Sequence, residues 1–173
     1  MEHTVNNEAK QTMLEENKID IGLIGKPENL KNIHFDFLEE IEDIFVAAKD
    51  YLRNLKARGI QKDHILQSST LMLLDKNNMT RQYIDDYLQE NQIIIKDSID
   101  ISDMDLLIDF ARIGVGVACV IKNFVREDLE NGTLVEIPLG FPIHKREVGF
   151  AYKTTTKPSK SLAEFIHFYK TYR

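Results

Sequence analysis

Hydrophobic and polar positions alternate along this chain in two periods, one typical of strands and one typical of helices. The clearest example is the stretch from Ile99 to Ile121. Apolar residues recur there at helical spacing from Leu106 to Ile113, which predicts a helix that buries a broad face. The following run, Val115–Ile121, is apolar and broken only by Gly116, as in a strand that is buried on both sides.

Signals for the ends of this helix accompany the pattern. Ser102 and Asp105 have the spacing of a capping box, so we expect Ser102 to cap the first turn. Gly114 follows the last apolar position and is expected to end the helix in the left-handed conformation. The stretch is therefore predicted to run from a strand end through a helix and a glycine link into a buried strand.

The same reading extends over the rest of the chain. Strands are predicted at 19–24, 70–74, 93–99, 133–137 and 147–153. Helices are predicted at 6–17, 79–90, 123–130 and 161–169. The segment 35–49 is expected to contain a strand, with a helix as the competing interpretation for 38–49. Residues 50–69 are polar and mixed, with a short helix or turn near 63–66.

Further capping signals support two of these helices. Asn77 or Asn78 is the natural N-cap of the helix at 79–90, and Ser161 with Glu164 forms a second capping box. Strands and helices thus alternate several times, which predicts an α/β fold with a mostly parallel sheet.

Charge and cysteine content narrow the classes of function. The net charge is -6 over 173 residues, and an acidic surface repels phosphate backbones, so this chain alone is a poor nucleic-acid binder. Cys119 lies in an apolar strand and is expected to be a small buried hydrophobe. The N-terminus lacks the pattern of a signal peptide, and no apolar run approaches membrane-spanning length. We expect a cytoplasmic protein without membrane contact.

Catalytic and cofactor motifs are missing from the sequence. The histidines share no metal-ligand spacing, and there is no phosphate-binding loop. The Gly114–Gly116 pair precedes a strand rather than a helix, so it is not a dinucleotide fingerprint. We expect a non-enzymatic protein with no metal and no cofactor.

Two long segments resemble the effector-binding domain of LysR-type transcriptional regulators. They are TLMLLDKNNMTRQYIDDYLQENQI at 70–93 and DISDMDLLIDFARIGVGVACVIKNFVREDLENGTLVEIPL at 100–139. The family pattern has a polar loop ending in Thr-Arg, a small polar turn, a Gly-x-Gly before a strand and an L-x-x-G-x-L ending. The chain supplies these as Thr80-Arg81, Ser102-Asp103, Gly114–Gly116 and Leu129–Leu134. Upstream, KIDIGLIGKPEN at 18–29 resembles another strand and loop of the family.

The resemblance implies a two-lobed fold like that of type-2 periplasmic binding proteins. Lobe I would comprise 1–46 plus 147–173, and lobe II would comprise 47–146. Relative to the family, the helix-turn-helix domain and the first strand and helix of the effector domain have no counterpart here, so we expect an N-terminally truncated effector domain. The implied function is binding of a small effector and oligomerisation, with a homodimer expected, and with DNA bound only through the absent domain. The alternatives are a solute-binding protein of the same fold and a non-catalytic truncated paralogue.

The resemblance also places the effector at strand-to-helix turns, where helix N-termini offer unpaired N–H groups that suit an anion. The candidate effector-binding residues are Asn78, Thr80, Ser102, Asp103, Lys122, Gly25 and Lys26.

Each candidate also has a structural interpretation. Asn78 and Ser102 suit helix caps, Thr80 suits a first helical turn, and lysines are usually solvated. The carboxylate of Asp103 would oppose an anion, so either it faces solvent or the effector carries a donor or a cationic group. The identity of the effector cannot be read from the sequence.

Overall fold

The computed structural model describes residues 7–27, 29–30, 32–154 and 158–172. The chain divides into two compact units, 1–40 with 146–173 and 41–145. The boundary at which the chain returns to the first unit, after Lys145, lies next to the predicted boundary after Arg146. The boundary at which the chain enters the second unit falls after Glu40 rather than after Val46. The reason is that Asp43–Ala48 forms a fully buried strand of the second unit, which a boundary at Val46 would cut.

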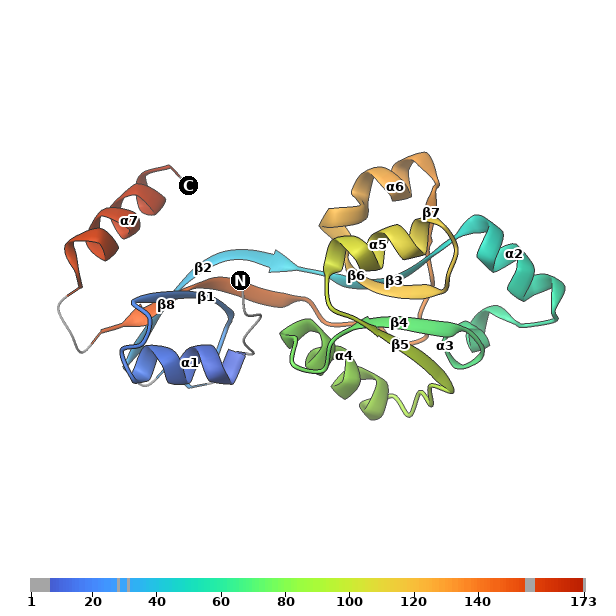
Figure 1. Ribbon diagram of the computed structural model, residues 1–173, viewed down its shortest axis with the longest axis horizontal. Helices are drawn as coiled ribbons and strands as arrows, with labels where there is room; N and C mark the ends of the chain where they lie inside the picture. The colour runs from blue at the N-terminus through green and yellow to red at the C-terminus, as the bar shows by residue number, and fades with distance from the viewer. Residues whose placement is uncertain (1–6, 28, 31, 155–157, 173) are drawn as a thin grey trace. The chain divides into compact units, whose positions relative to one another are not determined.

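The second unit contains a five-stranded sheet of order β5-β4-β6-β3-β7 (Figure 1). Its strands are β3 (Asp43–Ala48), β4 (Thr70–Leu74), β5 (Asp97–Ile101), β6 (Val117–Ile121) and β7 (Leu134–Glu136). The strand β4 is parallel to β5 and to β6, whereas β3 is antiparallel to β6 and to β7. Four strands therefore share one direction and only β3 opposes them, so the predicted mostly parallel sheet is confirmed for this unit.

Helices cover both faces of this sheet (Figure 1). They are α2 (Lys49–Ala57), α3 (Ile65–Ser68), α4 (Met79–Glu90), α5 (Met104–Arg112) and α6 (Arg126–Asn131), with short 3-10 turns η1 (Lys62–His64) and η2 (Lys122–Val125). Successive residues of each strand point to opposite faces of the sheet and so belong to two separate hydrophobic cores. Phe45, Leu71 and Cys119 pack against α2, α3 and α4, while Val46, Met72 and Val120 pack against α5 and η2. Period-two alternation thus gives each face its own helical layer.

The predicted central stretch has the expected architecture. The residues of β6 from Val117 to Val120 are all buried, including Cys119, as predicted. Gly114 follows α5 with φ +80°, the left-handed conformation that favours glycine. A Cβ at Gly116 would overlap the carbonyl oxygen of Thr70, so only glycine lets β6 approach β4 this closely.

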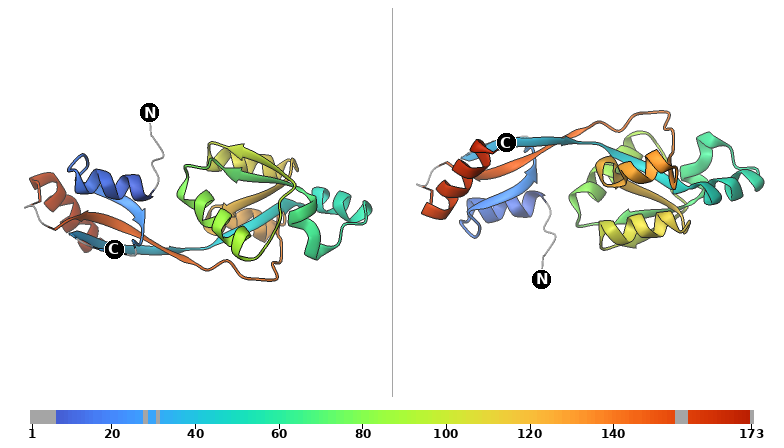
Figure 2. Two further views of the ribbon diagram at one scale, coloured as in Figure 1. Left: turned by 90° about the horizontal axis from the view of Figure 1, so that it is seen from below. Right: turned by 90° about the horizontal axis from the view of Figure 1, so that it is seen from above.

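The first unit is built on a three-stranded sheet of order β1-β8-β2. Its elements are α1 (Asn7–Glu15), β1 (Ile21–Gly25), β2 (Ile33–Ile41), β8 (Arg146–Lys153) and α7 (Lys160–Thr171). The strands β2 and β8 lie side by side (Figure 2). Because β1 pairs antiparallel with β8, the expectation of mostly parallel sheets is wrong for that pair.

The two helices of this unit lie on opposite faces of its sheet (Figure 1). Leu14 of α1 packs against Ile24 and Ala151. On the other face, Phe150 makes edge-to-face contacts with Phe165 and Tyr169 of α7. The fold of the unit therefore depends on apolar contacts on both faces.

An acidic residue of β2 ties the second of these helices to the sheet. Asp36 is bonded to His34 at 2.9 Å, accepts from the Tyr152 hydroxyl at 3.2 Å and pairs with Lys170 of α7 at 3.4 Å. Burial alone would raise the pKa of Asp36, but the hydrogen bond with His34 and the charge of Lys170 outweigh it and lower the pKa.

Several sequence predictions need correction. The expected strand within 35–49 is confirmed by β2 and β3, and the competing helix over 38–49 is wrong because the helix begins only at Lys49. The segment 50–69 was expected to hold only a short helix or turn, but α2 occupies its first residues. That helix was missed because only Leu55 among its residues is fully buried, so its apolar stripe is narrow. The predicted strand at 93–99 starts only at Asp97, since Ile93 and Ile95 pack as a connection against the core.

Two predicted helix caps are also wrong. Asp103, not Ser102, caps α5, and Ser159, not Ser161, caps α7 by accepting from the Leu162 N–H. The cap of α4 is Asn78, one of the two residues predicted for this role. The predicted start of the first helix, Asn6, lies outside the described residues.

Replacing Gly116 with alanine tests the close approach of β6 to β4. The Gly116→Ala protein should lose about 1–3 kcal/mol of unfolding free energy because the added methyl group forces the strands apart. Urea denaturation measures this loss. Gly140→Ala is the matched control, because a Cβ there meets nothing within 4 Å. Equal stability of the two variants would contradict the packing argument.

The Asp36 network predicts a pH dependence of stability. Because its pKa is lowered in the folded state, its stabilisation is complete above the unfolded-state value of about 3.9 and is lost as the pH falls through the folded-state value. The urea denaturation midpoint of the Asp36→Asn protein should therefore fall less steeply than that of the parent protein as the pH is lowered from about 5 to about 2. The control is Asp97→Asn, at an exposed β5 carboxylate without an ion pair among the described residues. If the urea midpoints of Asp36→Asn and of the parent protein fell equally steeply with decreasing pH, this role of Asp36 would be refuted.

Candidate functional site

The carboxyl ends of the parallel strands carry two turns that lead into helices on opposite faces of the sheet. The strand β4 leads into α4 through residues 75–78, and β5 leads into α5 through residues 102–103. The Asp75 N–H donates to the Ile101 carbonyl at 3.1 Å, which joins the two turns directly. The N-termini of both helices therefore open at one edge of the sheet.

The first turn is organised by Asn78. Its side-chain oxygen accepts from the Thr80 N–H at 2.8 Å, and its own N–H donates to the Asp75 carbonyl at 2.8 Å. Thr80 is buried behind this cap. The first turn of α4 holds no acidic residue, so the partial positive charge of this helix end is left uncompensated by its own side chains.

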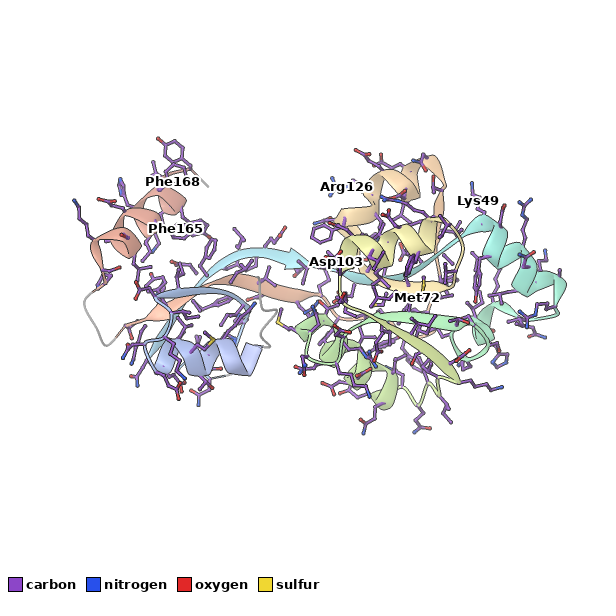
Figure 3. The ribbon with its side chains drawn as sticks, in the orientation of Figure 1. Lys49, Met72, Asp103, Arg126, Phe165 and Phe168 are labelled. Atoms are coloured by element: carbon purple, nitrogen blue, oxygen red, sulfur yellow. The ribbon has the colours of Figure 1, made fainter. Side chains whose placement is uncertain are left out.

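The second turn is organised by Asp103, which stands at the start of α5 (Figure 3). Its carboxylate accepts from the Asp105 and Leu106 N–H groups at 2.8 and 3.1 Å. This geometry explains why an acidic residue stands here, since it neutralises the helix N-terminus itself. Ser102 is exposed and does not cap the helix.

Arg81 holds the two turns in place, although in the sequence it stands out only as part of the Thr80-Arg81 motif. Its side chain is 7 % exposed, and its Nη1 donates to the Leu74 carbonyl at 2.8 Å and to Asp100 at 2.6 Å. Its Nε donates to Asp85 at 2.8 Å. The guanidinium therefore ties α4 to the ends of β4 and β5, and the Thr80-Arg81 pair was the signal that could have identified it.

Electrostatics strengthen this arrangement. Burial alone would lower the pKa of Arg81, but the hydrogen bonds with Asp85 and Asp100 outweigh burial and raise it. Arg81 therefore carries a permanent, compensated charge, which suits a positioning role better than direct capture of an anion.

Lys122 lies at the same edge of the sheet, directly after β6, but its ammonium group already forms ion pairs within the protein. Its ammonium pairs with Glu42 at 2.9 Å and with Glu136 at 3.2 Å. The hydrogen bond with Glu42 raises the pKa of Lys122, and Glu136 adds to the effect. The residue thus links the end of β6 to β7 and to the residue before β3.

Gly25 and Lys26 belong to the other unit. Gly25 pairs with Val148 in the β1–β8 ladder, and Lys26 forms an ion pair with Glu147 at 2.6 Å. The structure thus brings Asn78, Thr80, Ser102 and Asp103 to one edge, adds Lys122 there as a paired cation, and leaves the unit-1 residues as a separate group.

Among the described residues, no three His, Cys, Asp or Glu side chains are arranged to hold a metal ion. None of the described helices combines the length and the apolar composition needed to cross a membrane.

Replacing Arg81 with methionine tests the positioning role. The Arg81→Met protein should lose about 1–3 kcal/mol of unfolding free energy because the buried Leu74 carbonyl loses its donor. The unfolding free energy of Arg81→Lys should lie between those of the parent protein and Arg81→Met, since a lysine ammonium cannot bond all three acceptors as the planar guanidinium does. Urea denaturation measures both, and Arg126→Met is the control because Arg126 of α6 is exposed (Figure 3). A loss in Arg81→Met no larger than in the control would exclude the proposed clamp.

The sequence of the chain matches a known protein family. Residues 3–173 match the family model for the LysR substrate binding domain. The chain is 22 % identical over 152 residues to the HTH-type transcriptional regulator YeiE of Escherichia coli (strain K12), covering 87 % of this chain and 50 % of that protein. The chain thus spans about half the length of this curated relative.

Solved structures agree on the fold. The regulatory domain of HypT from Salmonella typhimurium with bromide ion bound superposes with a TM-score of 0.75 at 18 % identity, covering 96 % of this chain and 78 % of that one. The CcmR regulatory domain of Synechocystis PCC6803 in complex with 2-PG gives a TM-score of 0.72 at 13 % identity, covering 94 % and 77 %. At such identities the likeness shows the fold alone. The family match over nearly all residues confirms the predicted α/β, type-2 periplasmic-binding-protein-like fold, and the chain belongs to the LysR substrate binding domain family.

Proposed function

We propose that this chain is the effector-binding and oligomerising module of a LysR-type transcriptional regulator. Support comes from the family match and from the relative YeiE, an HTH-type transcriptional regulator of which the chain spans half. The net charge of -6 disfavours direct contact with DNA, so DNA binding is assigned to a separate domain. Effector binding would shift a conformational equilibrium of this module and so change the regulator's output.

The proposed effector site centres on the joined turns after β4 and β5. The single observation that carries it is the Asp75–Ile101 hydrogen bond, with Arg81 fixing both strand ends, since this arrangement presents two helix N-termini at one edge. Asn78, Thr80, Ser102 and Asp103 would line the site from the second unit. Gly25 and Lys26 of the first unit remain candidate effector-binding residues on the family resemblance alone. Lys122 would act through its ion-paired charge rather than by direct binding.

The chemistry of the two turns suggests how an effector would be oriented. The α4 end has a neutral cap and suits an anionic group. The α5 end carries Asp103 and Asp105 and suits a hydrogen-bond donor or a cationic group. We therefore propose a small effector with an anionic group directed to Asn78 and a donor directed to Ser102 and Asp103. The bromide bound to HypT and the 2-PG bound to CcmR make an anionic effector reasonable for this fold.

The relatives are transcriptional regulators, and we propose a non-catalytic role without cofactor for this chain. The only cysteine, Cys119, is buried in β6, which disfavours a thiol nucleophile. We further propose that the protein acts as a homodimer in the cytoplasm.

A thermal-shift screen of small metabolites, including carboxylates, phosphate esters and their neutral amide or alcohol counterparts, tests the anionic site. A true effector raises Tm through binding to the folded state. In Asn78→Asp the cap is retained, but a negative charge replaces the neutral amide. Affinity for an anionic effector should therefore fall about tenfold or more.

The matched control is Asn131→Asp, because the Asn131 side chain accepts from the Thr133 N–H in the same way and lies outside the proposed site. An effector that binds Asn78→Asp as tightly as the parent protein would rule out this site. Tight, salt-sensitive DNA binding by this chain alone, or turnover of a screened metabolite, would overturn the proposed function.

A further inference from the structure

A cavity lies within the second unit, between α2 and β7. It has a volume of about 720 Å³ and is lined by α2, the segment that follows it, and β7 with the residues after it. Ligand pockets typically measure about 300–1,000 Å³, so it is large enough for a small molecule. We call it the α2–β7 groove; its lining residues are Lys49, Asp50, Leu52, Arg53, Leu55, Lys56, Ile60, Lys62, Ile65, Val135, Glu136, Ile137 and Pro138.

The floor of the α2–β7 groove is apolar. Leu55, Ile65 and Ile137 are buried beneath it, and Leu52 and Val135 are half-buried in its walls. These side chains come from elements on both sides of the cavity, so an apolar group placed between them would be covered from two directions.

The rim of the groove is basic, in a chain whose net charge is -6. Lys49, Arg53 and Lys56 recur at helical spacing on α2, which begins at Lys49 (Figure 3). Arg53 pairs with Asp50, but Lys49, Lys56 and Lys62 form no ion pair with any described residue.

The acidic residues of the rim are already engaged. Asp50 pairs with Arg53, and Glu136 pairs with Lys122. The three unpaired lysines therefore leave an excess positive charge around an apolar cavity. This combination fits a molecule with an apolar body and an anionic head.

The groove is separate from the proposed effector site. Along β3, Asp43 pairs with Ile121 and Ala48 pairs with Leu134, so α2 starts at the amino edge of the parallel strands. The turns that carry Asn78 and Ser102 lie at the carboxyl edge, and no candidate effector residue lines the groove.

We propose that the α2–β7 groove binds a small amphipathic carboxylate, with its apolar chain on the Leu52–Leu55 side of α2 and its head group between Lys56 and Lys62. This would be a second ligand site of the chain, independent of the effector site at the joined turns.

The test uses the full chain labelled with ¹⁵N and titrated with sodium octanoate, with 1-octanol and sodium acetate as matched probes. Octanoate should shift the amide signals of α2 and of 134–138 in a saturable manner. Acetate should not, and 1-octanol should bind at least about fivefold more weakly because it lacks the charge. The double variant Lys56→Glu/Lys62→Glu should weaken octanoate binding by about fivefold or more, while Lys96→Glu, at an exposed lysine outside the groove, should not.

Salt provides an independent readout if the double variant fails to fold. Raising the ionic strength should weaken octanoate binding to the parent protein and leave 1-octanol binding unchanged. The proposal is overturned if octanoate does not saturate, if it shifts only the turns at 75–80 and 101–103, or if octanol binds equally well. Concentration-dependent loss of the groove signals without any ligand would also overturn it, since a second copy would then cover the groove.

Discussion

The buried guanidinium of Arg81 is the interaction on which the candidate site depends. It connects α4, β4 and β5, because one guanidinium donates to a strand carbonyl and to two carboxylates at once. Without it the Leu74 carbonyl would be buried without a donor at the point where α4 must begin. The positions of Asn78 and Thr80, three residues and one residue before it in the chain, follow from this anchor.

A consequence of this arrangement is an electrostatic contrast between two neighbouring helix ends. Asn78 caps α4 without charge, whereas Asp103 caps α5 with a carboxylate. Joined by the Asp75–Ile101 bond, the two ends form one edge with a positive and a negative part. Such an edge can orient a ligand that carries both an acceptor and a donor. This contrast accounts for the carboxylate of Asp103 at a turn where an anionic effector was expected.

The sequence predicted most of the fold because its strongest signals are local. The buried strand after Gly116 and the cap at Asn78 are set by side chains next to them in the chain, and both predictions are confirmed. The partners of Lys122 could not be predicted, because Glu42 lies eighty positions away and becomes a neighbour only through strand pairing. The cap of α5 was misplaced by one residue, because Ser102 and Asp103 both satisfy the local rule and only the backbone decides between them.

The most direct test of the account is hydrogen–deuterium exchange of the chain with and without the metabolite that most increases its Tm. If the two turns form one effector-binding edge, exchange should slow together in peptides covering 75–81 and 101–106 and remain unchanged in α2 and β7. Slowed exchange at only one of these turns, or at neither, would contradict the claim that Arg81 and the Asp75–Ile101 bond build a single site.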